Sequence, residues 1–531
     1  MEPTPPRSPT ASESTERPAA QVGHLIGIDA GTTALKAGVF DADGTTLSVA
    51  TEEYRIVTPS SDRAELDPER YWEALVGATR RALEQAGVQP AGIEAISVSS
   101  QGETVTPVAA DGTPLGPSIV WLDNRARAEA TELASLFDVT AVYAATGVPE
   151  VNPTWPACKI LWWRRHEPEL FAQAARFLLV EDLLLHRLTG RFVSEGGVLS
   201  TTLLYDIRSG GWWPPMLDAL GLTPGRLPDI AAPGAVVGLL RHQAAEALGL
   251  QPGVRVVAGG MDQGAGAVGV GNVAPGMVSE STGGALTLQA SIERSDGDRT
   301  RRTPVYVHSA PGQYLYCPVC PTGGMVLTWF RDQFAATELS RAAAEGLDAY
   351  DLLTALAATV PAGAEGLTML PHLAGAFSPE YEPRARGVWS GFTLAHGKGH
   401  FVRAILEAVA YMLRRNLELL ADAGSPADVI RSHGGGARSD LWCQIKADVT
   451  GRPVVTLMGE HSAIRGNAML AGVAAGAFAD LGEACAAMVV PNRRFEPIPS
   501  THAAYEAGYQ RYLELFDTLR PSFAGHGPGH G

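Results

Sequence analysis

Residues 256–271 read V-V-A-G-G-M-D-Q-G-A-G-A-V-G-V-G, and this stretch decides how the rest of the chain is interpreted. The apolar residues up to Val257 predict the end of a buried strand, and the glycines that follow allow a tight turn because they carry no Cβ. Asp262 is the acidic residue of the stretch. A carboxylate at a strand end is typical of the sites of α/β proteins. The same residue is equally suited to cap the Gly/Ala-rich helix predicted next, so local sequence leaves both interpretations open.

A second turn with a carboxylate lies near the N-terminus. Residues 22–40 predict two strands joined by Asp29-Ala-Gly-Thr-Thr33. The N–H and O–H donors of such a turn can bind phosphate, while its carboxylate holds a hydrated Mg²⁺. Similar turns also occur in hairpins that bind nothing. This turn is therefore informative only together with the features that follow.

The second half of the chain repeats this pattern. Residues 277–289 predict a strand, a Thr-Gly-Gly turn and another strand, and residues 429–440 predict a strand that runs into three glycines and a helix. Glycines at a helix N-terminus allow a phosphate or a flat base to approach the backbone. Two phosphate-type turns that open two halves predict a duplicated α/β domain pair with a cleft between the domains.

The segment Trp121-Leu-Asp-Asn-Arg125 is suited to binding a polyol. Its indole, carboxylate and guanidinium stand at alternate positions of an extended chain and therefore share a face. The ring can stack on C–H groups while the charged groups bond hydroxyls. The alternative is an ion pair between Asp123 and Arg125 beside a partly buried tryptophan. Aromatic residues at 155, 162 and 163 could line the same pocket, although such clusters more often belong to a core.

Composition narrows the class of protein. The 531 residues are 45% hydrophobic and 18% charged, with a formal net charge of -16, which argues against nucleic acid or an anionic membrane as a partner. We find no apolar run of 18 residues, so no spanning helix is expected. The five cysteines are scattered and fit a reducing, cytoplasmic compartment. Cys317 and Cys320 form the one close pair, but they lack further partners for zinc, so we treat them as structural.

Six short sequence motifs occur together along residues 23–520. They are Asp29-Ala-Gly-Thr-Thr33 with Lys36, Trp121-Leu-Asp-Asn-Arg125, Gly259-Gly-Met-Asp-Gln263, Ser281-Thr-Gly-Gly284, Gly434-Gly-Gly-Ala437, and Gly387-Val-Trp-Ser-Gly-Phe392 followed by a helix from His400. With these motifs the chain resembles the FGGY family of carbohydrate kinases. Residues Thr146, Gly147, Lys159 and Trp162 look most like its xylulokinase-like members.

The resemblance implies an α/β fold of two actin-like (ribonuclease-H-like) ATPase domains flanking a deep interdomain cleft. We expect a disordered tail at 1–21, an N-terminal domain at 22–270 with the sugar, the phosphates and the base, a nucleotide-binding C-terminal domain at 271–520, and a disordered tail at 521–531. The cleft would close over ATP, Mg²⁺ and an open-chain sugar or polyol. The expected partner is this small molecule, and a homodimer is compatible with the resemblance.

The resemblance also assigns roles to residues of this sequence. Asp262 would be the general base, and Asp29 and Asp262 would lie at Mg²⁺. The nucleotide would be bound by Gly31, Thr32, Thr33, Lys36, Thr282, Gly283, Gly284, Gly434, Gly435, Gly436, Ala437 and Asp440. The sugar would contact Gln101, Glu103, Trp121, Asp123, Arg125, Trp155, Asp262 and Gln263.

Differences between this sequence and the family motifs bear on which substrate is predicted. Xylulokinases carry Gln-Met-His-Gly where this chain has Gln101-Gly-Glu-Thr104, so the histidine contact is missing. Glu103 falls where glycerol kinases place a substrate-binding glutamate, but Gly102 replaces the arginine of that motif. We predict an ATP-dependent kinase for a ketopentose such as D-xylulose, ahead of substrates of the ribulose, glycerol or erythritol type. A non-kinase actin-like ATPase is the rival class, and it would have no use for a polyol-binding segment.

Overall fold

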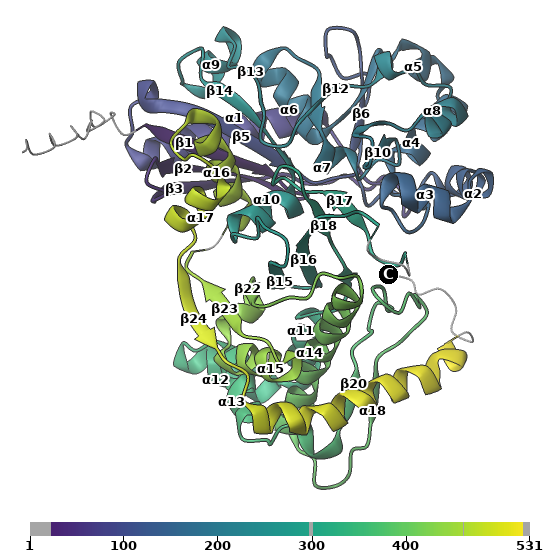
Figure 1. Cartoon of the computed structure of the whole chain (residues 1–531), viewed down its shortest axis with the longest axis vertical. Helices are drawn as coiled ribbons and strands as arrows, with labels where there is room; N and C mark the ends of the chain where they lie inside the picture. The colour runs from purple at the N-terminus through teal and green to yellow at the C-terminus, as the bar shows by residue number, and fades with distance from the viewer. Residues whose placement is uncertain (1–22, 297–300, 460, 524–531) are drawn as a thin grey trace, which may run out of the picture.

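Residues 23–296, 301–459 and 461–523 are described by the computed structural model of the chain. The tail predicted at 1–21 therefore lies outside the described residues. Figure 1 shows two halves, one above the other, each built around its own sheet.

The first half is built on a six-stranded sheet of order β13-β14-β5-β1-β2-β3. Strand β5 lies between β1 and β14 and is parallel to both, while β2 is antiparallel to β1 and β3 is antiparallel to β2. The carboxyl ends of these parallel strands meet at one edge, where Asp29 pairs with Ser99 and Met261 with Ser100. The strands are β1 (His24–Ala30), β2 (Ala34–Asp41), β3 (Thr46–Glu53), β5 (Ile93–Ser100), β13 (Val236–Leu239) and β14 (Arg255–Met261).

Alternating side chains of β1 divide this sheet between two cores. Ile26 and Ile28 join the core under helices α1 and α6, whereas Leu25 joins the core under α16. This alternation follows from the two-residue period of a strand. The helices of the first half are α1 (Pro68–Ala86), α2 (Arg127–Leu136), α3 (Val139–Thr146), α4 (Pro156–His166), α5 (Pro168–Gln173), α6 (Val180–Thr189), α7 (Gly196–Leu199), α8 (Pro214–Leu220), α9 (His242–Leu248) and α10 (Asp262–Gly269).

Small sheets extend the first half beside the main one. A four-stranded sheet of order β4-β7-β6-β8 supports the segment from Trp121 to Arg125. Its strands are β4 (Glu65–Leu66), β6 (Val105–Val108), β7 (Ser118–Ile119) and β8 (Arg176–Leu179), and two further pairs join β9 (Val193–Glu195) to β12 (Asp229–Ala231) and β10 (Tyr205–Asp206) to β11 (Gly211–Trp212).

The second half repeats the pairing pattern of the first. Strand β15 is antiparallel to β16 and parallel to β22, as β1 is to β2 and β5. The order is β17-β18-β16-β15-β22-β23-β24, with β19 paired to β16. These strands are β15 (Val278–Thr282), β16 (Leu286–Ile292), β17 (Val305–Val307), β18 (Tyr314–Tyr316), β19 (Val319–Cys320), β22 (Ile430–His433), β23 (Val454–Leu457) and β24 (Pro491–Phe495), and β20 (Thr368–Leu370) pairs with β21 (Val388–Ser390).

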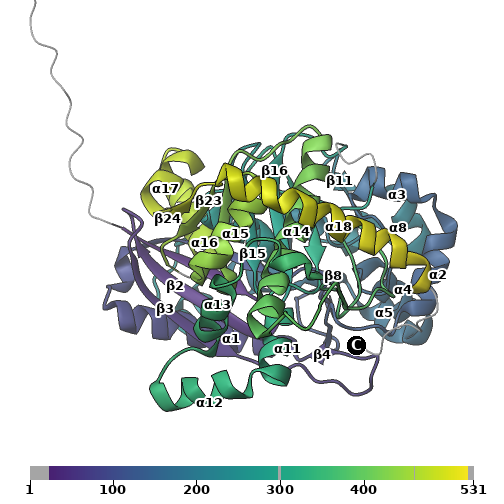
Figure 2. The ribbon, with the colours of Figure 1, turned by 90° about the horizontal axis from the view of Figure 1, so that it is seen from below.

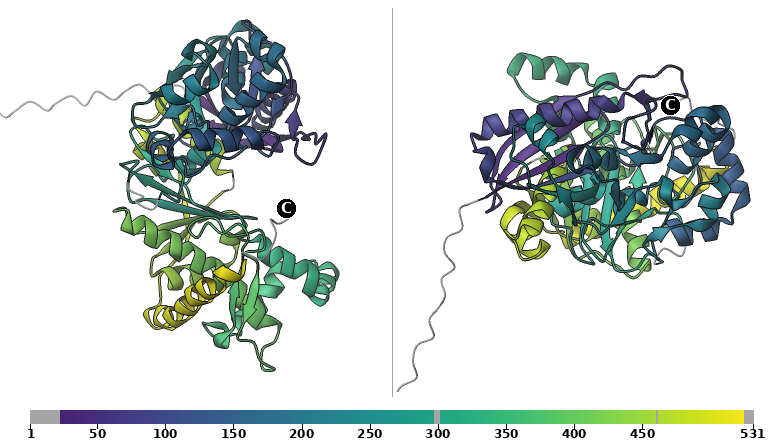
Figure 3. Two further views of the ribbon diagram at one scale, coloured as in Figure 1. Left: turned by 90° about the vertical axis from the view of Figure 1, so that its right-hand side faces the viewer. Right: turned by 90° about the horizontal axis from the view of Figure 1, so that it is seen from above.

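Long helices cover the second sheet, and Figure 3 shows its strands between the first half and these helices. They are α11 (Met325–Phe334), α12 (Ala336–Glu345), α13 (Ala349–Ala358), α14 (Lys398–Asp422), α15 (Asp440–Thr450) and α18 (Pro499–Phe523). Figure 2 shows α18 running across the lower face of the molecule. This helix extends into the tail predicted at 521–531, because Phe523 is buried against Phe516. No helix among the described residues is long and apolar enough to cross a membrane.

Helix α16 (Ser462–Ala475) returns from the second sheet to the first, followed by α17 (Leu481–Met488). Figure 1 shows both beside β1 and β2. Glycines let the backbones of α16 and α10 touch, since a Cβ on Gly466 would lie 1.9 Å from the carbonyl oxygen of Ala265, and one on Gly269 would lie 1.8 Å from that of Ser462. The range predicted for the second domain, 271–520, thus includes a helix that packs on the sheet of the first.

Candidate active site

Asp262 is the first residue of α10 and directly follows β14. Met261 occupies the cap position, so the capping interpretation survives only as a bond from the Gln263 backbone N–H to Asp262 Oδ1 at 2.6 Å. Burial, together with the negative neighbours Asp29 and Glu103, raises the pKa of Asp262 to about 8. A buried carboxylate whose pKa is raised in this way is characteristic of catalytic sites.

Asp29 lies at the end of β1, at the same edge of the sheet. Its Oδ1 accepts a hydrogen bond from the Ser99 hydroxyl at 2.8 Å. Burial raises the pKa of the Asp29 carboxyl, while Ser99 and the Lys36 ammonium oppose this shift. Lys36 stands opposite Asp29 on β2. The predicted pair of carboxylates, Asp29 and Asp262, is therefore brought together by two strand ends.

The turn after Asp29 is held by its own backbone and by one neighbour. The Gly31 N–H donates to the Ala34 carbonyl at 3.1 Å, and the Tyr54 hydroxyl donates to the Gly31 carbonyl. Thr32 Oγ1 accepts the indole N–H of Trp121 at 3.0 Å. Trp121 thereby connects the predicted phosphate turn to the predicted sugar segment.

Glu103 adds a third carboxylate to this group. Its φ of 59° is rare for a residue with a side chain, and such strain is concentrated at functional sites. Burial raises the pKa of Glu103 to about 7, and Lys159 opposes the shift. The Lys159 ammonium donates to the carbonyl oxygens of Glu103 and Val120, at 2.8 and 3.0 Å, and burial lowers its pKa to about 7. Neither this lysine nor its position beneath Glu103 was predicted as part of the site.

Asp123 and Arg125 form the ion pair that was the alternative to sugar binding. Asp123 accepts bonds from the Ala64 N–H at 2.7 Å and from three nitrogens of Arg125 at 2.7 to 3.0 Å. Arg125 also bonds Glu65 and lies over the ring of Trp162. Because Asp123 is 1% exposed and fully occupied, the structure favours a structural role for the pair.

Three other predicted sugar contacts have different surroundings. Trp155 is buried in the core, with its indole N–H on the Glu150 carbonyl at 2.9 Å, so its prediction as a pocket residue is not supported by its position. Gln101 is buried and donates to the Tyr71 hydroxyl at 2.9 Å. Gln263 accepts from the Gln289 amide at 2.6 Å, which connects α10 to β16 of the second half.

The predicted nucleotide residues of the second half line two cavities that meet at one loop. A cavity of about 540 Å³ is lined by Thr282, Gly283, Gly284, Gly435 and Gly436, among others. A cavity of about 710 Å³ contacts both halves and is lined by Asp29, Lys36, Gly434, Gly435 and Ala437, together with Arg438, Arg465 and Arg493. Asp440 lines neither cavity, and its carboxylate is paired with Arg493, which lines the larger one. Asp29 and Lys36 thus share a cavity with the glycine turn of the second half, whereas Gly31, Thr32 and Thr33 line neither cavity.

The donor set fits a magnesium ion carried by a nucleotide. No group of three or more His, Cys, Asp or Glu side chains in the described part of the chain could hold a metal by itself. Mg²⁺ needs no such cage, since it commonly takes one or two carboxylates and completes its shell with phosphates and water. Asp29 and Asp262 could provide these carboxylates; burial raises the pKa of both, and the negative neighbours Asp29 and Glu103 add to the shift at Asp262.

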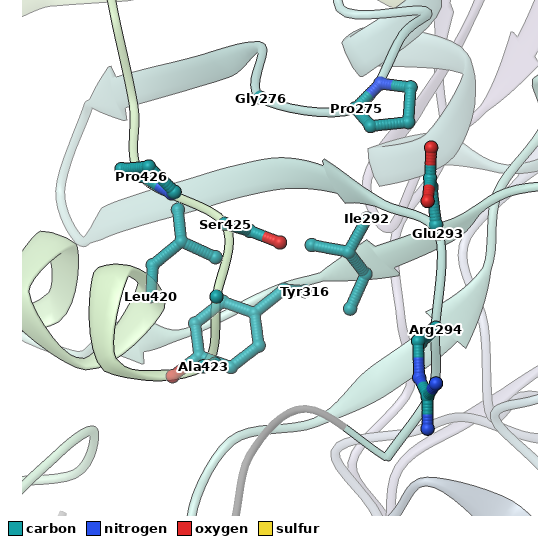
Figure 4. Close-up of a pocket in the computed structure, with 11 residues that line it drawn as sticks. Pro275, Gly276, Ile292, Glu293, Arg294, Tyr316, Leu420, Ala423, Ser425 and Pro426 are labelled. Carbon is teal, nitrogen blue, oxygen red and sulfur yellow. The ribbon is translucent and has the colours of Figure 1, made fainter.

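A separate cavity of about 320 Å³ lies where the loop after α14 meets the second sheet, and Figure 4 shows Leu420, Tyr316 and Ile292 around it. None of the predicted site residues lines it. It is therefore not part of the candidate active site.

Family models and relatives agree on the kind of protein that this chain resembles. The model described as "FGGY family of carbohydrate kinases, N-terminal domain" matches residues 24–269, and that of the C-terminal domain matches residues 287–475. A gluconokinase of Bacillus subtilis (strain 168) is 29% identical over 94% of this chain and 97% of its own length. A xylulose kinase of Escherichia coli (strain K12) is 30% identical over 94% of this chain and all of its own length. The crystal structure of xylulose kinase from Rhodospirillum rubrum superposes with a TM-score of 0.86 at 30% identity, covering 94% of this chain and 100% of that one.

Proposed function

Because the chain belongs to the FGGY family of carbohydrate kinases, which transfer phosphate to an alcohol group, we propose that it transfers the γ-phosphate of ATP to a hydroxyl of an uncharged open-chain sugar. A ketopentose such as D-xylulose is the first substrate we propose. The observation that carries the proposal is the proximity of Asp262, Asp29 and Glu103 beyond the ends of neighbouring strands, with Asp29 lining a cavity together with the Gly434–Ala437 turn of the second half.

Asp262 is the proposed general base. Its carboxylate lies at the N-terminus of α10, and a raised pKa makes it a stronger proton acceptor for a sugar hydroxyl. Thr32, Thr33 and Lys36 would provide the donors that orient the phosphates, whereas the N–H of Gly31 is bound to the Ala34 carbonyl within the turn. Asp29 and Asp262 would hold Mg²⁺ when it is bound with ATP, and the ion would offset the negative charge of the phosphates. Transfer then depends on alignment of the hydroxyl and exclusion of water more than on covalent chemistry.

Electrostatics favour a neutral sugar over a sugar acid. Asp262 and Glu103 already place two carboxylates in the pocket. The nearby Lys159 ammonium is bound to two backbone carbonyls, and Arg125 is bound to Asp123 and Glu65. The Arg125 guanidinium is already paired, so once Asp262 and Glu103 are ionised a substrate carboxylate would meet like charges. Since the relatives include both a gluconokinase and a xylulose kinase, the acidic groups of the site favour xylulose over gluconate as the proposed substrate.

An ADP-release assay with a substrate panel tests the proposal. D-Xylulose, D-ribulose, glycerol, erythritol and D-gluconate would each be offered with ATP and Mg²⁺, and the phosphorylated position would be determined by phosphorus NMR. We expect turnover with a ketopentose and none of comparable kcat/KM with gluconate. A preference for gluconate would contradict the neutral-sugar proposal, and no sugar-stimulated turnover would contradict the kinase itself.

The role of Asp262 is tested with Asp262→Asn and its pH profile. We expect kcat to fall by about 10²- to 10⁴-fold, the usual contribution of a general base, while the exposed control Asp218→Asn keeps wild-type turnover. In the wild type, kcat/KM should increase with pH towards about 8, because the base must be deprotonated in the free enzyme. Unchanged kcat in Asp262→Asn would remove this residue from the mechanism.

The five cysteines of the chain are free thiols, and on this basis we propose a cytoplasmic location.

A further inference from the structure

Asn467 of α16 is a fully buried polar residue beneath the sheet edge that carries the acids. Its amide nitrogen donates to the Ile28 carbonyl and to the Ser99 hydroxyl, each at 2.7 Å. Its amide oxygen accepts the Ser97 hydroxyl at 3.1 Å. One side chain thus bonds β1 once and β5 twice.

These contacts fix the direction of every hydrogen bond as far as Asp29. A carbonyl can only accept, so the nitrogen of Asn467 must face Ile28, and the same nitrogen therefore donates to Ser99. Ser99 has one hydroxyl hydrogen, and because Asn467 fills one of its acceptor positions, that hydrogen is directed to Asp29 Oδ1 at 2.8 Å. One oxygen of Asp29 is occupied as a result, and the orientation of the other is set.

Strand β14, which precedes Asp262, passes close to the same amide. A Cβ on Gly259 would lie 2.0 Å from Asn467 Oδ1, so β14 can pass Asn467 only with glycine at this position. The glycine contacts of α16 with α10 hold the helix in place. Asn467 therefore lies under the strand ends that carry both Asp29 and Asp262.

We propose that Asn467 is a positioning residue of the metal site, which acts through Ser99 to hold the Asp29 carboxylate with one oxygen bonded and the other free for the divalent cation of the nucleotide. The proposal rests on the role of Asp29 in the proposed function. Hydrogen-bond partners of metal-binding side chains commonly change metal affinity or activity by about 10- to 100-fold when they are lost. The site would thus depend on a residue that lies between two strands of the second sheet in sequence, far from Asp29.

Direct binding of Mn²⁺ in the presence of ADP, measured by electron paramagnetic resonance, tests this inference without requiring a sugar. Ser99→Ala removes the bond to Asp29. Asn467→Asp keeps the shape and the acceptor for Ser97 but removes the amide donor to Ser99 and to the Ile28 carbonyl. The matched control Ser97→Ala removes a buried hydroxyl from the same strand and the same asparagine without touching Asp29. Thermal unfolding by circular dichroism verifies that each variant is folded.

We expect Ser99→Ala and Asn467→Asp to weaken Mn²⁺ by about 10-fold or more, and Ser97→Ala by less than about two-fold. In the kinase assay the first two should raise the KM for Mg²⁺ while the KM for the sugar stays nearly constant. If Asn467→Asp does not fold, Ser99→Ala decides alone. Equal losses in Ser99→Ala and Ser97→Ala, or unchanged Mn²⁺ affinity, would overturn the inference. Loss of Mn²⁺ affinity in a protein that phosphorylates no sugar would instead support the inference and reject the proposed function.

Discussion

Each half of the molecule buries carboxylates directly beneath a turn of the cleft, and the two groups are neutralised differently. In the second half, Glu280 lies before the Thr282 turn and accepts Lys446 Nζ at 2.6 Å, with both side chains fully buried. The hydroxyls of Thr282 and Ser432 occupy its remaining acceptor positions. We call this group the lysine-paired acid.

In the first half, Glu181, Asp182 and Glu195 are buried beneath the turn before Asp262, and we call them the acid cluster. Glu181 accepts the Gly260 N–H at 2.9 Å, and Glu195 accepts the Val198 N–H at 2.6 Å. One oxygen of each of the three carboxyls has no hydrogen-bond partner among the described residues, and no lysine or arginine is paired with them there.

The difference shows two ways of burying an acid. A buried charge is tolerated when a cation and hydrogen bonds satisfy it, and otherwise the group takes up a proton. Burial raises the pKa of Asp182 and of Glu195 to about 7, and that of Glu181 well above its usual range, with Glu195 as a further cause for Glu181. The stability of the protein should therefore depend on Lys446 at the lysine-paired acid, and on pH at the acid cluster.

Lys446→Met should have the largest effect on stability. It leaves the Glu280 carboxylate buried without its cation, which typically costs about 3–5 kcal/mol in free energy of unfolding. Urea denaturation at pH 7 measures this loss, and Arg452→Met, an exposed cation after the same helix, should change stability by less than about 0.5 kcal/mol. Adding Glu280→Gln to Lys446→Met should restore part of the loss. A Lys446→Met protein as stable as wild type would contradict the pairing.

The acid cluster should make the wild-type protein less stable as pH rises from about 5 to about 8. The unfolded chain releases these protons near pH 4, whereas the folded protein holds those of Asp182 and Glu195 to about 7. Between these values the folded state binds more protons, so the free energy of unfolding falls with pH, by up to about 1.4 kcal/mol per pH unit for each proton. Urea denaturation in a pH series measures the slope. Stability that increases over this window would contradict protonation of the cluster.

Much of the fold was predictable because its signals are local. Buried strands, glycine turns and helices with an apolar face are encoded by neighbouring residues, and the predicted two-domain fold and family are confirmed. The return of α16 to the first sheet was not predictable in this way, since it depends on contacts between residues as distant as Gly466 and Ala265. The composition of the last residues predicted a tail from residue 521. Helix α18 instead continues to Phe523, whose ring packs on that of Phe516.

The candidate site was predictable where backbone geometry creates it. In a turn such as the one at Asp29, the carboxylate, the glycine and the hydroxyls are close in sequence and can be recognised there. Asp123 and Arg125, two positions apart, were compatible with a sugar contact and with an ion pair. The bonds of the Arg125 guanidinium to Asp123 and to the distant Glu65 show that it is occupied. The roles of Lys159 and Asn467 in the site could not be predicted from local sequence, because the groups they bond are distant in the chain. Whether the site residues act as proposed stays a prediction.

Glu181→Gln should change the free energy of unfolding least. It tests whether the acid cluster is protonated, in contrast to the lysine-paired acid, which is ionised. The new amide keeps an acceptor for the Gly260 N–H and adds a donor for a neighbouring carboxyl, so no buried group loses its partner. We expect the free energy of unfolding to change by less than about 1 kcal/mol at pH 6 and to exceed that of wild type at pH 8, where the wild-type acids are forced to ionise. Because Gly260 lies two residues before Asp262, turnover at pH 6 should be retained if the amide keeps the turn in place. A loss of several kcal/mol at both pH values would mean that Glu181 is held as a carboxylate, as Glu280 is, by a cation.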